Sequence, residues 1–94
     1  MEKLEFEWDD AKARKNATKH GVTFEEAQSV FGDQLSSTFP DPDHSFEEDR
    51  LITIGTSERN RVLVVSHTDR EGRTRIISAR KATRRERSAY EEEA

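Results

Sequence analysis

The chain contains no cysteine, only two prolines and no long run of apolar residues. Without cysteine it has no disulfide framework, no zinc ribbon and no thiol nucleophile. The longest uninterrupted apolar run, Val62–Val65, is far shorter than the ~20 residues that span a bilayer, so we expect no contact with a membrane. The segment Met1–Glu5 lacks the apolar region of a signal peptide, and we therefore expect a cytoplasmic protein.

Large apolar side chains are also scarce. Leu, Ile, Val and Phe make up 18 of the 94 residues, close to the boundary of ~20% below which chains of high net charge are disordered. The net charge is only −4, so self-repulsion does not prevent folding. A chain of this length forms one small domain, here residues 1–94, with a thin core that a partner protein can extend.

The charge is distributed unevenly along the chain. Residues 1–49 have a net charge of −8, residues 50–87 have one of +7, and the tail Glu91–Glu93 adds −3. Ten of the eleven cations in the basic segment are arginine, whose guanidinium suits bidentate phosphate contacts and base stacking. The basic segment therefore indicates either a nucleic-acid surface or a solvated sheet face that pairs with acidic helices of the same chain.

Hydrophobic periodicity, capping boxes and turn residues predict an α+β fold. The expected elements are, in order, a strand at 4–8, helices at 11–20 and from 24 to near 32, a short strand at 35–39, strands at 50–57, 61–68 and 73–81, and a last helix that runs through 90. We predict one antiparallel β-sheet with two N-terminal helices and one C-terminal helix, all on one side of the sheet.

The last hairpin allows a prediction of strand register. Asp69–Gly72 is typical of a type I turn in a three-residue loop, which pairs Asp69 with Arg73. In this register His67 lies opposite Arg75 on the larger apolar face, whereas Arg80 lies on the half-polar face, the expected open surface of a binding groove. The half-polar face also holds Val62, Val64, Ser66, Thr68, Thr74, Ile76 and Ser78.

Four segments of the chain resemble a known family. They are Phe6-Glu7-Trp8-Asp9; Asn16-x-x-Lys19-His20-Gly21-Val22-x-Phe24-x-x-Ala27; Glu48-x-Arg50 with Gly55; and Arg75-Ile76-Ile77-Ser78-Ala79-Arg80-Lys81-Ala82-Thr83 with Glu86 and Tyr90. In this order, over residues 4–92, they resemble the BrnT family, the toxin half of a type II toxin–antitoxin pair.

The resemblance implies a RelE-like α+β domain and a metal-independent endoribonuclease that needs no cofactor and inhibits translation by cleaving RNA. It also implies a BrnA-like antitoxin of ribbon-helix-helix type that neutralises the toxin. The two proteins would form a heterotetramer that represses its own promoter, and the toxin would reach promoter DNA only through the antitoxin.

Metal-independent RNA cleavage needs a base for the 2′-hydroxyl, an acid for the leaving 5′-oxygen and cations for the phosphate. Among the histidines, His67 is best placed for proton transfer, because His20 ends a helix and His44 lies in a proline loop. The alternative for His67 is a core histidine with a satisfied hydrogen bond. The resemblance to RelE-like toxins adds Arg85 and Tyr90 as catalytic candidates, with a core anchor as the alternative for Tyr90.

The basic segment supplies the phosphate ligands. Arg75, Lys81 and Arg84 are expected to bind RNA phosphate, and Arg80 is expected to take part in catalysis. Arg84 and Arg85 lie in the first turn of the last helix, where cations oppose the helix dipole, and such local misfits are typical of functional sites.

Two questions stay open at the level of sequence. His67 and Arg75 share one face and Arg80 lies on the other, so either the strand bulges between Ile76 and Arg80 or one of these groups is structural. The second question is whether the chain is instead a non-catalytic module that binds its antitoxin and acts only in promoter autoregulation. No metal site is expected, because the acidic and histidine residues near the prolines lack ligand spacing: Asp41, Asp43, His44, Glu47 and Glu48.

Overall fold

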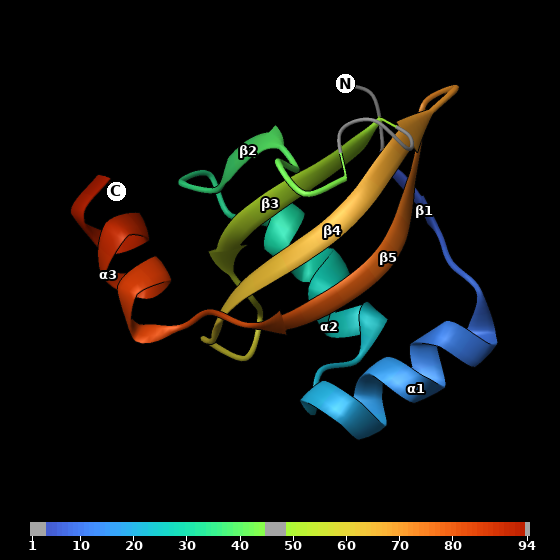
Figure 1. The fold of residues 1–94 in the computed structure, drawn as a ribbon, viewed down its shortest axis with the longest axis horizontal. Helices are drawn as coiled ribbons and strands as arrows, with labels where there is room; N and C mark the ends of the chain where they lie inside the picture. The colour runs from blue at the N-terminus through green and yellow to red at the C-terminus, as the bar shows by residue number, and fades with distance from the viewer. Residues whose placement is uncertain (1–3, 45–48, 94) are drawn as a thin grey trace.

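The computed structural model describes residues 4–44 and 49–93. Its elements are β1 (Glu5–Glu7), α1 (Asp10–His20), α2 (Phe24–Ser29), the 3₁₀ turn η1 (Val30–Gly32), β2 (Ser37–Pro40), β3 (Arg50–Thr56), β4 (Val62–Arg70), β5 (Arg73–Lys81) and α3 (Arg84–Glu93). The strands form one sheet in the order β1-β5-β4-β3-β2, with α2 behind it, α1 below β5 in this view and α3 beside the sheet (Figure 1). The predicted α+β class is confirmed.

The helix ends follow the capping signals of the sequence. The Asp9 side chain accepts a hydrogen bond from the Lys12 backbone N–H (3.0 Å), which begins α1. Gly21 ends α1 with a φ of 68°, a left-handed conformation that favours glycine. The Thr23 hydroxyl accepts a hydrogen bond from the Glu26 N–H (3.0 Å) and begins α2.

The core lies between α2 and the sheet. Phe24, Ala27 and Val30 are fully buried on one face of the α2–η1 segment, as the helical spacing predicts. They pack with other buried residues of one cluster: Val22, Leu63, Val65, Ile76 and Ala79. The cluster is small for a chain of 94 residues, which agrees with the scarcity of large apolar side chains.

Asn16 fastens α1 to the edge of the sheet. β1 pairs only with Arg73–Arg75, so the backbone of Ala79 has no strand partner on that side. The Asn16 side chain donates to the carbonyls of Ala79 (2.8 Å) and Val22 (2.9 Å), and its oxygen accepts from the Ala79 N–H (3.1 Å). A buried amide thus replaces a missing strand at this point.

Two details of the predicted architecture are wrong. The strand β1 runs parallel to β5, so the sheet is not wholly antiparallel. The helix α3 does not lie on the same side as α1 and α2: its residues Ala89 and Tyr90 line a groove together with Ile52, Ile54 and Val64 on the opposite face. No helix within residues 4–44 and 49–93 is long and apolar enough to cross a membrane.

The predicted register of the last hairpin is also wrong. Arg70 pairs with Arg73 around a two-residue loop, Glu71-Gly72, in which both residues have positive φ (50° and 80°). Positive φ at both positions is typical of a type I′ turn, which matches the twist of the flanking strands. Further along, Ser66 pairs with Ser78 but His67 pairs with Ile76, so Ile77 is an extra residue in β5.

This bulge changes which side chains share a face. Arg75 lies opposite Thr68 and Arg80 lies opposite Val64, so both arginines are on the face away from α1 and α2. His67 points into the core with Ile76 and Thr74, which the predicted register had placed on the open face. The bulge lies between Ile76 and Arg80, one of the two alternatives that the sequence left open.

Candidate functional site

A cationic pocket lies where the β3–β4 turn, the end of β5 and α3 meet. It has a volume of 480 Å³. Three of its lining side chains are cations: Lys81, Arg61, which is paired with Glu26, and Arg87, whose Nε lies 3.7 Å from Oε1 of Glu91, the one anion that lines the pocket. The remaining lining residues are Thr56, Asn60, Val62, Ala82 and Tyr90. Positive charge in a concave site of this size suits an anionic ligand.

Hydrogen bonds of a turn and of a capping box fix the two walls of this pocket. The β3–β4 turn is closed by the Ser57 N–H, which donates to Arg61 O (2.8 Å), and by Asn60, which has a φ of 62°. Asparagine tolerates this left-handed conformation better than most residues. On the other wall, Thr83 and Glu86 form the predicted capping box: the Glu86 N–H donates to Thr83 Oγ1 (3.1 Å) and the Thr83 N–H to Glu86 Oε1 (2.8 Å).

Tyr90 lies between the cationic pocket and the groove described next, and lines both. Its hydroxyl donates a hydrogen bond to Asp33 Oδ2 and lies 3.1 Å from Thr56 Oγ1. Burial and the neighbouring Asp33 carboxylate raise the pKa of Tyr90, so its hydroxyl stays protonated at neutral pH. A phenol is therefore present at the wall of a cationic pocket.

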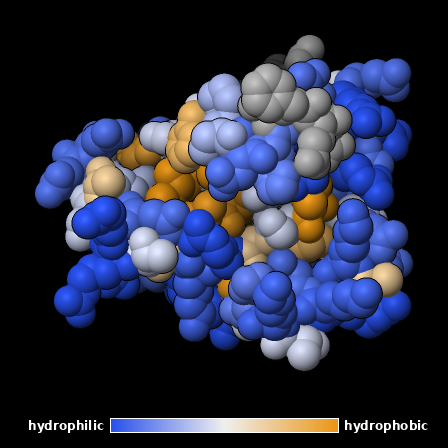
Figure 2. All heavy atoms as spheres, in the orientation of Figure 1, coloured by the Kyte–Doolittle hydropathy of each residue, from blue (hydrophilic) through white to orange (hydrophobic). Residues whose placement is uncertain are grey.

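A second, more apolar hollow lies on the open sheet face, alongside α3. Figure 2 shows a hydrophobic area over the strands, bordered by the hydrophilic surface of α3. This groove has a volume of 510 Å³, and its floor is formed by Phe39, Ile52, Ile54 and Val64. Phe39 is 43% exposed, although it is a large apolar residue. The half-polar open face that the sequence predicts is thus present, with a different set of residues.

Arg80 connects the sheet to α3 rather than pointing into the cationic pocket. Its guanidinium forms a bidentate pair with Glu86, with distances of 2.7 Å to Oε1 and 2.9 Å to Oε2. These bonds from Arg80 are the main reason that the pKa of Glu86 falls to about 2. Because α3 has no buried residue, this pair and the Tyr90 contacts are its principal attachments to the sheet.

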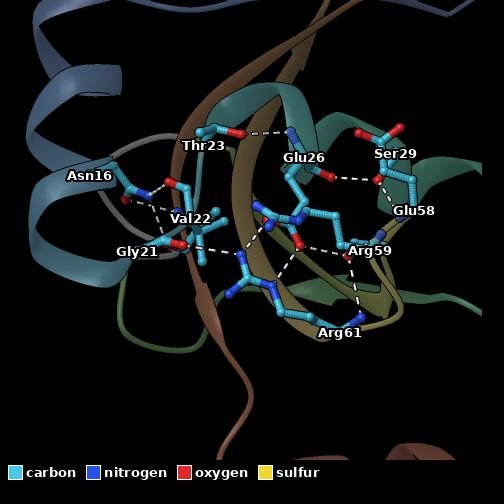
Figure 3. A network of polar contacts seen from close by, with 11 residues as sticks. Asn16, Gly21, Val22, Thr23, Glu26, Ser29, Glu58, Arg59 and Arg61 are labelled. Atoms are coloured by element: carbon cyan, nitrogen blue, oxygen red, sulfur yellow. Dashed lines mark hydrogen bonds and ion pairs between the residues drawn. The ribbon is translucent and has the colours of Figure 1, made fainter.

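Arg61, which lines the pocket, is fixed by a buried carboxylate, Glu26 (Figure 3). Glu26 is 2% exposed and accepts hydrogen bonds from Arg61 Nε (2.8 Å), from Arg61 Nη2 and from the Ser57 hydroxyl (2.7 Å). Arg61 also donates to the Gly21 carbonyl (3.0 Å). The network ties the β3–β4 turn to α2, and it holds one cation of the pocket in place.

His67, the predicted proton-transfer group, is 1% exposed. Its Nε2 lies 2.8 Å from Thr53 Oγ1 and its Nδ1 lies 3.0 Å from Asp69 Oδ1. Its ring packs edge-on against Phe31, with centroids 4.9 Å apart. Both nitrogens are therefore occupied and the ring is enclosed, as in the alternative of a core histidine with satisfied hydrogen bonds.

The other predicted residues are spread over the surface. Arg75 lies at the far edge of the sheet, where its Nη1 is 3.3 Å from Glu7 Oε2. Arg84 and Arg85 are exposed at the start of α3 and form no ion pair with any described residue. Of the seven predicted site residues, the cationic pocket contains Lys81 and Tyr90.

Sequence reasoning missed Arg61, Arg87 and Asp33. Arg61 follows a turn and Arg87 stands three residues before Tyr90 on α3. These positions predict that both arginines are exposed, but they do not predict that both lie near Tyr90. Within the part of the chain that the structure describes, no three His, Asp or Glu side chains are grouped so as to hold a metal ion. Two residues of the acidic loop, Glu47 and Glu48, lie outside that part.

Comparison with known proteins shows which family the chain belongs to. No curated protein sequence matches the chain. The crystal structure of the Brucella abortus ribonuclease toxin BrnT, at 1.1 Å resolution, matches with a TM-score of 0.69 and 24% identity, over 87% of this chain and 100% of that one. A family model described as the ribonuclease toxin BrnT of type II toxin–antitoxin systems matches residues 8–86. The chain therefore belongs to the BrnT family of ribonuclease toxins.

Proposed function

We propose that the chain is a metal-independent endoribonuclease that cleaves RNA at the cationic pocket and thereby inhibits translation. The observation that carries the proposal is the position of Tyr90 in the wall of a pocket that Arg61, Lys81 and Arg87 also line. Lys81 and Arg87 bind the scissile phosphate, and Arg61 supplies positive charge from the fixed side of the pocket. Tyr90 contacts the ribose next to the phosphate.

The chemistry follows from these groups. The 2′-oxygen attacks the neighbouring phosphorus, and the charge that develops on the phosphate oxygens is stabilised by fixed cations. Arg61 cannot move far, because Glu26 and the Gly21 carbonyl hold its guanidinium. A cation whose position is set before RNA binds needs little reorganisation when charge develops.

The proposal gives other roles to two of the predicted catalytic residues. Arg80 acts through Glu86, as the residue that positions α3 and hence Tyr90. His67 contributes to the core, because an enclosed ring with two hydrogen-bonded nitrogens has no path to RNA. Arg84 and Arg85, exposed beside the pocket-forming end of β5, guide the RNA backbone by long-range attraction.

The proposal is tested with purified protein and a single-stranded RNA in a buffer that contains EDTA. We expect cleavage that is insensitive to EDTA and that leaves 2′,3′-cyclic phosphate ends, the product of 2′-oxygen attack. Replacement of the 2′-hydroxyls of the RNA by hydrogen is expected to abolish cleavage. Loss of activity in EDTA with recovery on adding Mg²⁺ would contradict metal independence.

The same assay separates the proposal from a non-catalytic module that acts only in promoter autoregulation. Such a module would bind its antitoxin and leave RNA intact at every protein concentration. Salt dependence gives a second distinction, because RNA held by Lys81 and Arg87 is expected to dissociate as ionic strength rises. A folded, soluble chain that neither binds nor cleaves RNA would favour the module.

A type II family implies an antitoxin, and we propose that a segment of a BrnA-like ribbon-helix-helix antitoxin occupies the apolar groove in a heterotetramer. The floor of the groove is apolar, whereas its rim carries the carboxylates Asp43 and Glu93, and its one cation, Arg80, is already paired with Glu86. The complementary segment therefore has large apolar side chains flanked by Lys or Arg. A segment bound there contacts Tyr90 and α3, and so blocks the cationic pocket.

Ile54→Asp tests this surface. A carboxylate on the apolar floor is expected to weaken binding of the co-expressed antitoxin at least ~10-fold, because the apolar contact is lost and a charge is desolvated. RNA cleavage by the variant is expected to match wild type, since Ile54 does not line the cationic pocket. Unchanged antitoxin affinity in calorimetry would place the antitoxin elsewhere.

A further inference from the structure

Asp33 contacts Tyr90, and both of its carboxylate oxygens accept hydrogen bonds. Its Oδ1 accepts a hydrogen bond from the Leu35 N–H (2.9 Å), and its Oδ2 accepts from the Thr56 N–H (2.8 Å) and from the Tyr90 hydroxyl. Asp33 does not line the cationic pocket itself. It contacts the pocket through two residues that do line it, the Tyr90 hydroxyl and the Thr56 backbone N–H.

The backbone of β3 is shaped to admit this carboxylate. A Cβ at Gly55 would lie 3.1 Å from Asp33 Oδ2, 3.0 Å from Val30 Cγ1 and 2.9 Å from Ser36 Cβ. Any side chain at position 55 would push on the same oxygen that holds Tyr90 and the Thr56 N–H. Glycine at this position thus allows Asp33 to approach the sheet closely enough to reach both groups.

The direction of the hydrogen bonds follows from the chemistry of the groups. A carboxylate only accepts, so the Tyr90 proton points toward Asp33. The Thr56 hydroxyl, 3.1 Å away, can then only donate to Tyr90 Oη. A phenolic oxygen has two lone pairs, so one remains to accept a proton from a hydroxyl in the pocket.

We infer that Asp33 is the positioning residue through which Tyr90 acts as a base, an inference that rests on the proposed ribonuclease function. Tyr90 Oη accepts the 2′-hydroxyl proton of the RNA while the Tyr90 proton passes to Asp33 Oδ2. The 2′-oxygen forms a bond to phosphorus, the bond from phosphorus to the 5′-oxygen breaks, and the leaving oxygen takes a proton from water. Asp33 later returns its proton to solvent, which restores the starting state.

The ionisation of the two groups agrees with these roles. Burial raises the pKa of Asp33, but the hydrogen bonds from Thr56, Tyr90 and Leu35 together outweigh burial and lower the pKa. Asp33 is therefore a carboxylate over the neutral pH range, whereas Tyr90 is a neutral phenol. Alone, such a phenol is a poor base, and a carboxylate in contact with it supplies the acceptor that it lacks.

Charged groups from several elements surround the Asp33–Tyr90 pair. On the side of the cationic pocket they are Arg61 from the β3–β4 turn, Lys81 from β5, and Arg87 and Glu91 from α3. On the side of the groove they are Arg80, Glu86, Glu93 and Asp43. No histidine is among the residues that line either hollow.

Asp33→Asn removes the proton acceptor and retains one oxygen, which can accept from one of the two backbone N–H groups that Asp33 bonds, Leu35 on Oδ1 or Thr56 on Oδ2. We expect kcat for RNA cleavage in EDTA to fall about 10²-fold, with little change in the Kd of a 2′-deoxy RNA analogue. Wild-type kcat is expected to be flat between about pH 6 and 8, whereas that of Asp33→Asn rises with pH, because hydroxide replaces the lost base. Asp10→Asn, an exposed carboxylate on α1, is the matched control.

A purely structural role predicts a different pattern. If Asp33 only anchored α3, the variant would lose RNA affinity and thermal stability without gaining pH dependence. A kcat of Asp33→Asn that stays flat with pH, or that equals wild type, would overturn the inference. If Asp33→Asn fails to fold, the residual activity of Tyr90→Phe decides, because it should show the same rise with pH. Absence of cleavage by wild-type protein would instead reject the proposed function.

Discussion

Glu26→Gln is expected to lower the free energy of unfolding by about 2 kcal/mol. Removing one partner of a fully buried ion pair costs ~3–5 kcal/mol, and the value here is smaller because the Arg61 side chain is 27% exposed. The substitution leaves Arg61 and Ser57 bonded to a neutral amide inside the fold. For a domain of this size, about 2 kcal/mol is roughly a seventh to two fifths of the total stability.

The pH dependence of the free energy of unfolding tests whether the negative charge of Glu26 causes this loss of stability. Hydrogen bonds from Arg61 lower the pKa of Glu26 below its ordinary value of 4.5. A carboxylate with a lowered pKa stabilises the fold above the pKa of the unfolded chain, and this contribution is lost as pH falls through the folded value. Wild type is therefore expected to lose stability below pH 4.5, and Glu26→Gln is expected to lose less over the same range.

Glu25→Gln is the matched control, because Glu25 is the neighbouring residue on α2 and is exposed. Chemical denaturation at neutral pH measures the free energy of unfolding of wild type, Glu26→Gln and Glu25→Gln. We expect Glu25→Gln to unfold at the wild-type denaturant concentration and Glu26→Gln at a lower one. Identical midpoints for the two variants would show that the network of Figure 3 does not stabilise the fold.

The parts of the fold that depend on neighbouring residues in the sequence could be predicted. The capping residues Asp9, Gly21 and Thr23 each satisfy backbone groups within four residues of themselves, so their signals are complete in the sequence. The buried face of α2 follows from helical spacing alone. Strand pairing is different, because a single extra residue, Ile77, moves every side chain after it to the other face.

The candidate site could be predicted only in part for the same reason. Lys81 and Tyr90 have local signals, the end of a basic strand and the inner side of a capped helix. Arg61 and Asp33 lie near Lys81 and Tyr90 only because the β3–β4 turn and the end of η1 contact α3. Contacts between segments so far apart in the chain cannot be predicted from a single sequence. The burial of His67 likewise depends on Thr53 and Phe31, which belong to other elements.

Tyr90→Phe is expected to have the largest effect on activity. The ring and its packing are retained, whereas the hydroxyl that contacts Asp33 and Thr56 is lost. Removal of a group that takes part in proton transfer lowers kcat by ~10²–10⁴-fold, and we expect a loss of at least ~10²-fold here. RNA affinity is expected to change little, because Lys81 and Arg87 bind the phosphate.

Two measurements distinguish a direct effect of the lost hydroxyl from an indirect effect through α3. The helix keeps its capping box and the Arg80–Glu86 pair in the variant, so its helical content by circular dichroism is expected to match wild type. Ser88→Ala removes a hydroxyl from an exposed position of the same helix and is the matched control. Its cleavage rate is expected to equal that of wild type.

The central claim is that this chain cleaves RNA at the pocket where Tyr90 lies. The most direct test compares initial cleavage rates of one RNA by wild type, Tyr90→Phe and Ser88→Ala in the same EDTA buffer. We predict cleavage by wild type and Ser88→Ala at equal rates and a loss of at least ~10²-fold for Tyr90→Phe alone. A Tyr90→Phe rate within ~3-fold of wild type would contradict the account, because the reaction would then take place elsewhere on the molecule.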